Sequence, residues 1–143
     1  MTLTFDGRVI VPAADPEDGE RTARALAPHL EPTSTVIAAN VVEKSGGGID
    51  KASVEQREKH AEEIFERIRT QLDDAPGAVE TQILYGTDVV ERIFEAAREE
   101  AADAVVFNAR ESNRLAEFIT GDVARRLVKE ASVPVVALPE RDA

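Results

Sequence analysis

The sequence predicts a doubly wound α/β fold, in which a five-stranded parallel sheet carries helices on both of its faces. Short apolar segments alternate with amphipathic segments along the whole chain of 143 residues, a pattern typical of parallel sheets with crossover helices. The apolar segments are also nearly uncharged and rich in β-branched residues, as in strands that are covered on both sides. The length favours one domain that spans residues 1–143.

Five segments are expected to be strands because each is a short apolar run that ends at a turn or a charged residue. They are RVIVPA (8–13), STVIAANVVEK (34–44), VETQILYG (79–86), DAVVFN (103–108) and SVPVVALP (132–139). Between them, apolar residues recur at helical spacing in four segments, at 18–30, about 52–72, 87–101 and about 123–131. Pro28 is expected to end or kink the first of these helices. The segment SGGGID (45–50) reads as a flexible connector, because it has no Lys-Ser/Thr sequel of a phosphate loop.

The composition limits the partners of this protein. The chain has a formal net charge of -11, from 28 acidic and 17 basic residues, and it contains no cysteine. Such a charge repels nucleic acids and anionic membranes, and the lack of cysteine excludes disulfides and thiolate metal sites. No apolar run approaches a membrane span, and no signal peptide is visible, so we expect a soluble, cytoplasmic protein.

Two interpretations of the acidic surface remain open at this point. One is an ordinary acidic protein, and the other is adaptation to high salt, where screening weakens the repulsion between carboxylates. The scarcity of lysine, four residues in all, favours the second. The two histidines, His29 and His60, are far apart and lack the spacing of a metal site or a catalytic triad, so neither catalytic nor metal-binding residues are predicted.

Four segments together resemble the universal stress proteins of the UspA family. They are VIVPAAD (9–15), ANVVEK (39–44), YGTDVVERIFEAAREEAADAVVFNAR (85–110) and TGDVARRLVKEASVPVVALP (120–139). The resemblance implies a Rossmann-like sheet of the adenine nucleotide alpha hydrolase type, with strand order 3-2-1-4-5. It also implies a homodimer joined through the last strand, which would pair the unpaired edge formed by 133–138.

Many members of that family bind ATP through a motif of Gly, two residues, Gly, nine residues, Gly and Ser or Thr. Anchored on Gly121, the motif falls on Asn108, Glu111, Gly121 and Asp122, so that only one of its four positions is kept. Glycine lets a backbone approach phosphates closely, and a helix N-terminus attracts anions. Carboxylates at two motif positions would instead repel a triphosphate, unless a magnesium ion bridges them.

The resemblance places the remaining nucleotide contacts at the ends of the first two strands and in the loop after the fourth. The family has an acidic residue two places after the proline that corresponds to Pro12, whereas here the acid is Asp15, one place later. Val41 matches the apolar position near the adenine, and Val123 follows the motif. Arg110, with Asn113 and Arg114, either clasps a phosphate in place of glycine N–H donors or pairs with nearby acidic residues, and the surrounding acidic residues favour pairing.

Three functions follow from the resemblance. The first is a non-enzymatic regulator or interaction module in the stress response, which acts on a protein partner and does not bind ATP in the family manner. The second is a stress sensor that binds ATP or AMP with magnesium through a variant loop. The third is a weak ATPase, which ranks last because no general base or set of metal ligands is evident in the sequence.

Overall fold

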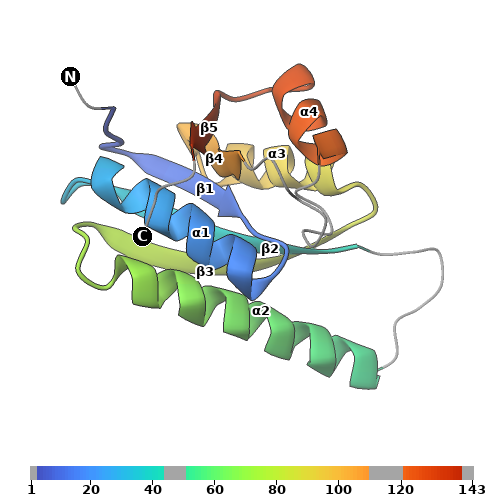
Figure 1. Ribbon diagram of the computed structural model, residues 1–143. Coiled ribbons are helices and arrows are strands. Elements are labelled where there is room, and N and C mark those ends of the chain that lie inside the picture. Colours follow the sequence, from blue (N-terminus) through green and yellow to red (C-terminus); the bar gives the residue numbers. More distant parts are fainter. Residues whose placement is uncertain (1–2, 44–50, 110–120, 140–143) are drawn as a thin grey trace.

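The computed structural model describes residues 3–43, 51–109 and 121–139 (Figure 1). Its strands form a parallel sheet in the order β3-β2-β1-β4-β5. The strands are β1 (Arg8–Pro12), β2 (Thr35–Glu43), β3 (Ala78–Gly86), β4 (Ala104–Ala109) and β5 (Val135–Pro139). The predicted fold class and strand order are therefore confirmed.

The helices agree with the predicted segments to within a few residues. They are α1 (Pro16–Leu26), the short 3₁₀ helix η1 (Ala27–His29), α2 (Lys51–Leu72), α3 (Val89–Glu99) and α4 (Gly121–Lys129). The first helix begins earlier than predicted because Asp15 caps it and Pro16 occupies its first turn. It then tightens into η1 at Pro28, which supplies no N–H to continue the α-helix.

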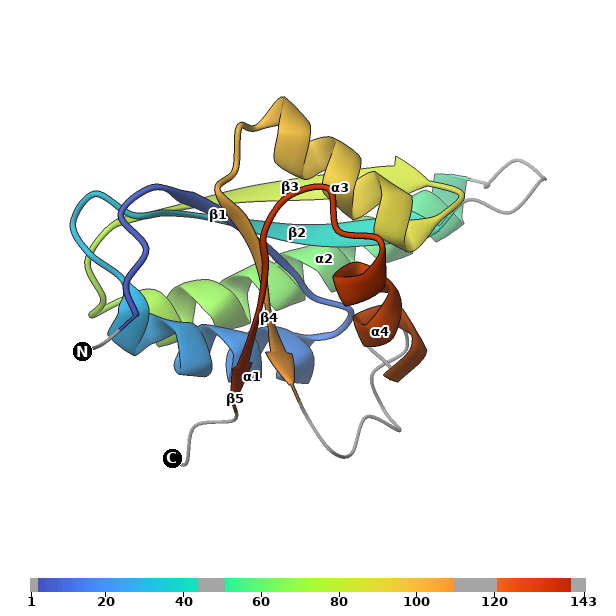
Figure 2. The ribbon, with the colours of Figure 1, turned by 90° about the horizontal axis from the view of Figure 1, so that it is seen from above.

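Helices cover the sheet on both faces, with α1 and α2 on one side and α3 and α4 on the other (Figure 2). Successive residues of the central strands alternate between the two resulting cores. In β1, Val9 and Val11 face α1 and α2, whereas Ile10 faces α3 and α4. The same alternation separates Val106 of β4 from Val105. Burial of both faces explains why these strands read as continuous apolar runs.

The close approach of α1 to α2 depends on Gly19, which is buried near the start of α1. A Cβ added at Gly19 would lie 3.1 Å from Ile68 Cγ1 and 3.2 Å from Ile64 Cγ2, both on α2. The contact brings α2 alongside the loop that connects β1 to α1. That loop forms part of the candidate site described below.

Candidate functional site at the ends of β1 and β2

The strand order reverses at β1, which lies between β2 and β4. Open parallel sheets bind ligands at such a point, outside the carboxyl ends of the strands, because the neighbouring loops leave in opposite directions. Pro12, at the buried end of β1, is paired in register with Ala39 of β2. The chain beyond Pro12 therefore starts at the mouth of this crevice.

A cavity of ≈ 360 Å³ opens beside the ends of β1 and β2. Its lining combines apolar, cationic and anionic groups from β2, α2, α3 and the loop between β1 and α1, namely Ala14, Asn40, Val41, Val42, Glu43, Arg57, His60 and Val89. Val41, which the family resemblance places near an adenine, thus lines the same cavity as Ala14. Arg57 donates from Nη1 to the backbone oxygen of Glu43 at 3.2 Å.

Asp15 follows the cavity residue Ala14 in the chain, and its side chain caps α1. Its Oδ1 accepts the backbone N–H of Asp18 at 2.7 Å, which makes Asp15 the N-cap of the helix. The family resemblance implies that an acidic group near this position contacts a nucleoside. In the structure the Oδ1 of Asp15 satisfies one of the unpaired N–H groups of the first helical turn.

Asn108 is buried near the end of β4, and its side chain bonds to the neighbouring strand β5. Its Nδ2 donates to the backbone oxygen of Leu138 in β5 at 3.1 Å. Its Oδ1 is buried and has no hydrogen-bond partner among the described residues. An amide side chain therefore fills the first position of the glycine motif, where a glycine would leave open space.

The last part of the motif starts α4, since Gly121 is its first residue. Asp122 is 70% exposed, and its Oδ1 pairs with Arg125 Nη2 at 2.7 Å. Val123 packs against the apolar core beneath α3 and α4. Arg110, Glu111, Asn113 and Arg114 lie outside the described residues. The structure thus brings Ala14 and Val41 together in one cavity. The side chain of Asn108 instead bonds to β5, and that of Asp122 pairs with Arg125.

Sequence reasoning missed the place of three polar residues that line the cavity, Asn40, Arg57 and His60. It also missed Asp18, which bonds to the cavity residue Ala14. Asn40 is buried within β2 and donates from Nδ2 to Ala13 O at 2.9 Å. His60 donates from Nε2 to Ala14 O at 3.0 Å. One polar residue inside the apolar run of β2 was a usable signal for Asn40. No local pattern connects His60 with Ala14, because they are 46 residues apart.

Asp18 is the most deeply buried carboxyl group among the described residues, with 1% of its surface exposed. Its Oδ2 accepts the backbone N–H of Ala14 at 3.1 Å. Burial raises the pKa of this carboxyl to about 6, against the opposing effect of the Ala14 hydrogen bond. Its position three residues after the N-cap is that of a capping box, a spacing that the sequence already displays.

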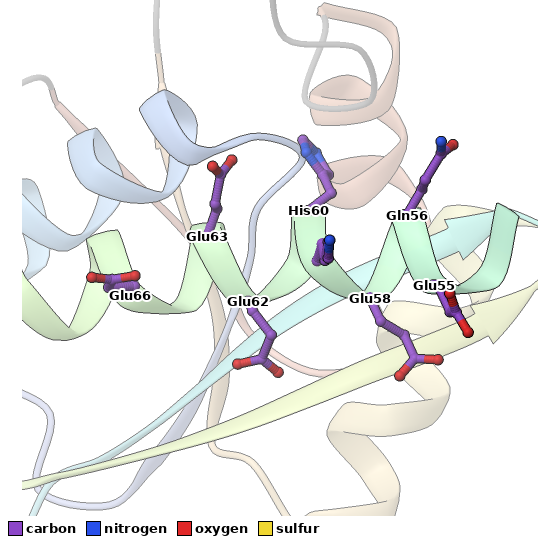
Figure 3. Close-up of a pocket in the computed structure, with 8 residues that line it drawn as sticks. Glu55, Gln56, Glu58, His60, Glu62, Glu63 and Glu66 are labelled. Carbon is purple, nitrogen blue, oxygen red and sulfur yellow. The ribbon is translucent and has the colours of Figure 1, made fainter. Parts of the chain in front are cut away.

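The outer part of α2 carries a broader, open hollow lined by a single helix (Figure 3). Acidic side chains dominate it and project from the helix in several directions, at Glu55, Glu58, Glu62, Glu63 and Glu66. The potential around such a surface is negative, which disfavours anionic ligands at this flank of the site. Within the described ranges, no helix is long and apolar enough to cross a membrane.

Comparisons with known proteins agree with this architecture. Residues 7–139 match the model of the universal stress protein family. A segment of 79 residues is 33% identical to the stress response protein NhaX of Bacillus subtilis; the match covers 55% of this chain and 47% of that protein. The chain thus spans about half the length of the curated relative it matches.

Solved structures share the fold at lower sequence identity. The universal stress protein of Archaeoglobus fulgidus in complex with dAMP has a TM-score of 0.64 at 19% identity, over 95% of this chain and 99% of that chain. An Arabidopsis thaliana family protein with AMP bound has a TM-score of 0.59 at 14% identity, over 94% and 92% of the two chains. Because the family model matches residues 7–139, this chain belongs to the universal stress protein family.

Proposed function

We propose that this protein is a non-enzymatic regulator or interaction module of the stress response, and that it does not hold ATP through the glycine motif of its family. Membership in the family supports a stress-response role, and family members are generally regarded as non-enzymatic. The proposal about ATP rests on the side chains at the motif positions. The observation that supports it most is the buried, hydrogen-bonded side chain of Asn108 at the first motif position.

Asn108 opposes phosphate binding through both its volume and its chemistry. Its side chain is 2% exposed and tied to Leu138 O, so vacating the position would break a buried hydrogen bond. Its Oδ1, which has no partner in the part of the chain that the structure describes, is an acceptor, as are the oxygens of a phosphate, and two acceptors cannot bond to one another. A glycine at the same position would present neither obstacle.

Asp122 opposes phosphate binding electrostatically. A helix N-terminus attracts an anion through its unpaired N–H groups and the positive end of its dipole. In α4 the first turn already contains the carboxylate of Asp122. A triphosphate at this place would meet a like charge, and only part of that charge is offset by the exposed pair with Arg125.

A second function, sensing of adenine nucleotides through a variant site, is favoured by the cavity beside β1 and β2. Relatives with the same fold are solved with dAMP and AMP bound. The cavity contains Val41 and Val89 as apolar walls and the guanidinium of Arg57 as a donor to an anion. AMP makes fewer demands on the motif than ATP, because it carries one phosphate.

Calorimetric titration with ATP and with AMP, each with magnesium in molar salt, distinguishes these functions. If the protein is a regulator that does not bind ATP, we expect no heat of binding when ATP is added. Saturable binding of either nucleotide at micromolar concentration supports the sensor instead. An assay for released phosphate during the same incubation then separates a sensor from an ATPase, and steady release would contradict a non-enzymatic role.

A further inference from the structure

The loop between β1 and α1 is held by side chains at three successive backbone groups. Asn40 of β2 donates to Ala13 O, and His60 of α2 donates to Ala14 O at 3.0 Å. Asp18 of α1 accepts the Ala14 N–H at 3.1 Å. Ala14, Asn40 and His60 also line the cavity. The position of the Ala14 peptide therefore sets the shape of one cavity wall.

Of the three side chains that hold the loop, only Asp18 is a buried carboxyl group, and burial disfavours its charged form. The carboxyl group is 1% exposed, and it lies at the third helical position of α1, where the Asp15 cap fixes its backbone. Transfer of a carboxylate from water into such a place is unfavourable unless several donors surround it. A proton removes the charge and leaves the buried carboxyl oxygen able to accept from Ala14.

The groups around Asp18 act in opposite directions on its pKa. Burial has the largest effect and raises the pKa, the Ala14 N–H lowers it, the Asp15 carboxylate raises it and Arg21 lowers it. From α2, His60 bonds to the carbonyl oxygen of the same residue, Ala14, and Arg67 pairs with Glu20 at 3.6 Å farther along α1. Strand β1, which leads into the loop, contributes the apolar residues Val9–Val11.

The start of α3 provides a natural comparison within the same molecule. Asp88 caps α3 as Asp15 caps α1, by accepting the backbone N–H of Glu91 at 3.1 Å. Glu91 occupies the position that corresponds to Asp18, but it is exposed. Only α1, of these two helices, places a buried carboxyl group against the loop that precedes it.

We propose that Asp18 is a proton-controlled latch on the cavity: its protonated form holds the Ala14 loop and the first turn of α1 closed, and its ionised form favours their opening. The direction follows from linkage, because an opened turn hydrates the carboxylate and restores its ordinary pKa. The closed form has the higher pKa, so its stability relative to the open form is greatest at low pH and declines as the pH rises through about 6.

Hydrogen exchange of individual amides, corrected for the intrinsic effect of pH, measures this opening directly. The reporters are the amides of Ala14, Asp18 and Gly19, which bond to Asp18 or Asp15. We expect their protection to fall on the order of tenfold between about pH 5 and about pH 7.5, as linkage gives for a shift of this size. The Glu91 amide should show no such trend, because the pKa of its cap Asp88 is lowered.

The variant Asp18→Asn removes the titration and keeps an acceptor oxygen for the Ala14 N–H. Its three reporter amides should be protected equally at both pH values, whereas the exposed control Asp74→Asn should behave like the unmodified protein. A carboxyl carbon NMR titration of the unmodified protein provides a test that needs no variant. A midpoint for Asp18 at the ordinary value of 3.8, or equal protection of the reporter amides at both pH values, would overturn the proposal.

Discussion

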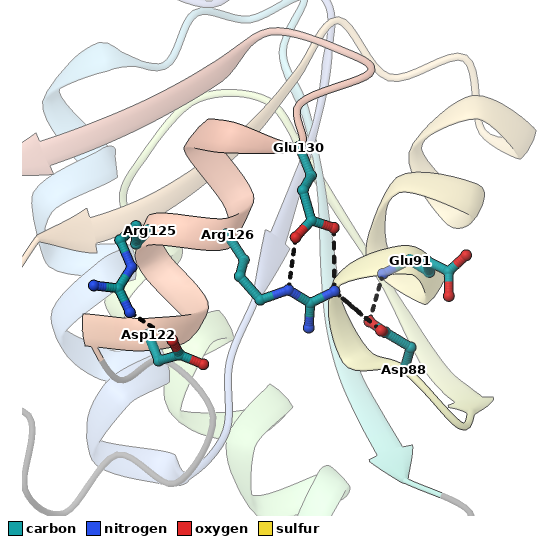
Figure 4. A network of polar contacts seen from close by, with 6 residues as sticks. All are labelled: Asp88, Glu91, Asp122, Arg125, Arg126 and Glu130. Carbon is teal, nitrogen blue, oxygen red and sulfur yellow. Dashed lines mark hydrogen bonds and ion pairs between the residues drawn. The ribbon is translucent and has the colours of Figure 1, made fainter.

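Arg126 of α4 reaches across to Asp88 at the start of α3, with its Nη2 3.0 Å from Asp88 Oδ2 and 3.2 Å from Oδ1 (Figure 4). Asp88 also caps α3, and Arg126 also bonds through Nε to Glu130 Oε2 at 2.7 Å. One carboxylate thus caps the start of α3 and also binds α4 through Arg126. The Glu91 N–H and the Arg126 guanidinium both keep the pKa of Asp88 below its usual value.

The first prediction is that Asp88→Ala destabilises the fold, mainly through the lost N-cap. Loss of such a cap costs about 1 kcal/mol. Asp88→Asn retains an acceptor for Glu91 and should cost less, since the partly exposed ion pair adds little. Because the folded-state pKa of Asp88 is lowered, the stability from its charge is present at neutral pH and disappears as the pH falls through that pKa.

Urea unfolding at pH 7 measures these differences in the free energy of unfolding. The variant Asp122→Ala serves as the control, because its pair with Arg125 is exposed on both sides. We expect that control to remain within about 0.5 kcal/mol of the unmodified protein. Equal stability of Asp88→Ala and the control would show that the cap does not contribute.

The second prediction concerns Gly77 in the turn before β3. Its φ of 98° is in the region that favours glycine, and a Cβ there would lie 2.6 Å from the backbone oxygen of Ser34. Gly77→Ala should therefore cost at least about 1–3 kcal/mol in unfolding experiments. At Gly86 the added Cβ would lie 3.1 Å from Arg92 Cβ, a contact that a small shift relieves, so Gly86→Ala is the matched control and should cost less. A milder effect at Gly77 than at Gly86 would contradict this.

The third prediction is a homodimer joined through β5, the strand at one edge of the sheet. A short strand without charge at an open edge favours pairing with a second copy. Ala137 is exposed on β5, so Ala137→Lys should shift the mass measured by light scattering from dimer towards monomer. The control, Ala78→Lys, places the same charge on the opposite edge strand β3 and should leave the mass unchanged. A monomeric mass for the unmodified protein at high concentration refutes the dimer.

The fourth prediction is that salt stabilises the protein. With a net charge of -11, self-repulsion is strongest at low ionic strength, so the Tm should rise between about 0.1 M and about 1 M potassium chloride. Glu58, Glu62 and Glu66 are exposed on α2 at intervals of four residues, where like charges repel. Changing all three to glutamine should raise the Tm at low salt and flatten its dependence on salt. An unchanged Tm across this range would leave no support for halophilic adaptation.

Much of the fold was predictable because its signals are local. The uncharged run around Val9–Val11 indicates a strand buried on both sides, and the helical spacing of Ile64 and Ile68 indicates the buried face of α2. Both patterns, the continuous apolar run and the helical spacing, depend only on residues that are close together in the sequence. The strand order is a relation between distant segments, and it followed from the family resemblance rather than from periodicity.

The site was less predictable, because its contacts join distant residues. The family resemblance implies a ligand contact for an acidic group near Asp15, whereas its spacing from Asp18 indicates the helix cap that the structure contains. That Asp18 is buried depends on how α2 packs on α1 at Gly19, which no local pattern reveals. The bond from His60 to Ala14 likewise exists only in the folded chain.

The most direct test of the central claim, that side chains at the motif positions exclude ATP, is calorimetry on the triple variant Asn108→Gly, Glu111→Gly and Asp122→Ser. The variant removes the buried amide and two carboxylates, while Gly121 remains at the start of α4. We expect no detectable ATP binding by the unmodified protein and weak, measurable binding by the variant, weak because Ala14 still lacks the acidic group. Tight binding of ATP by the unmodified protein would contradict this account.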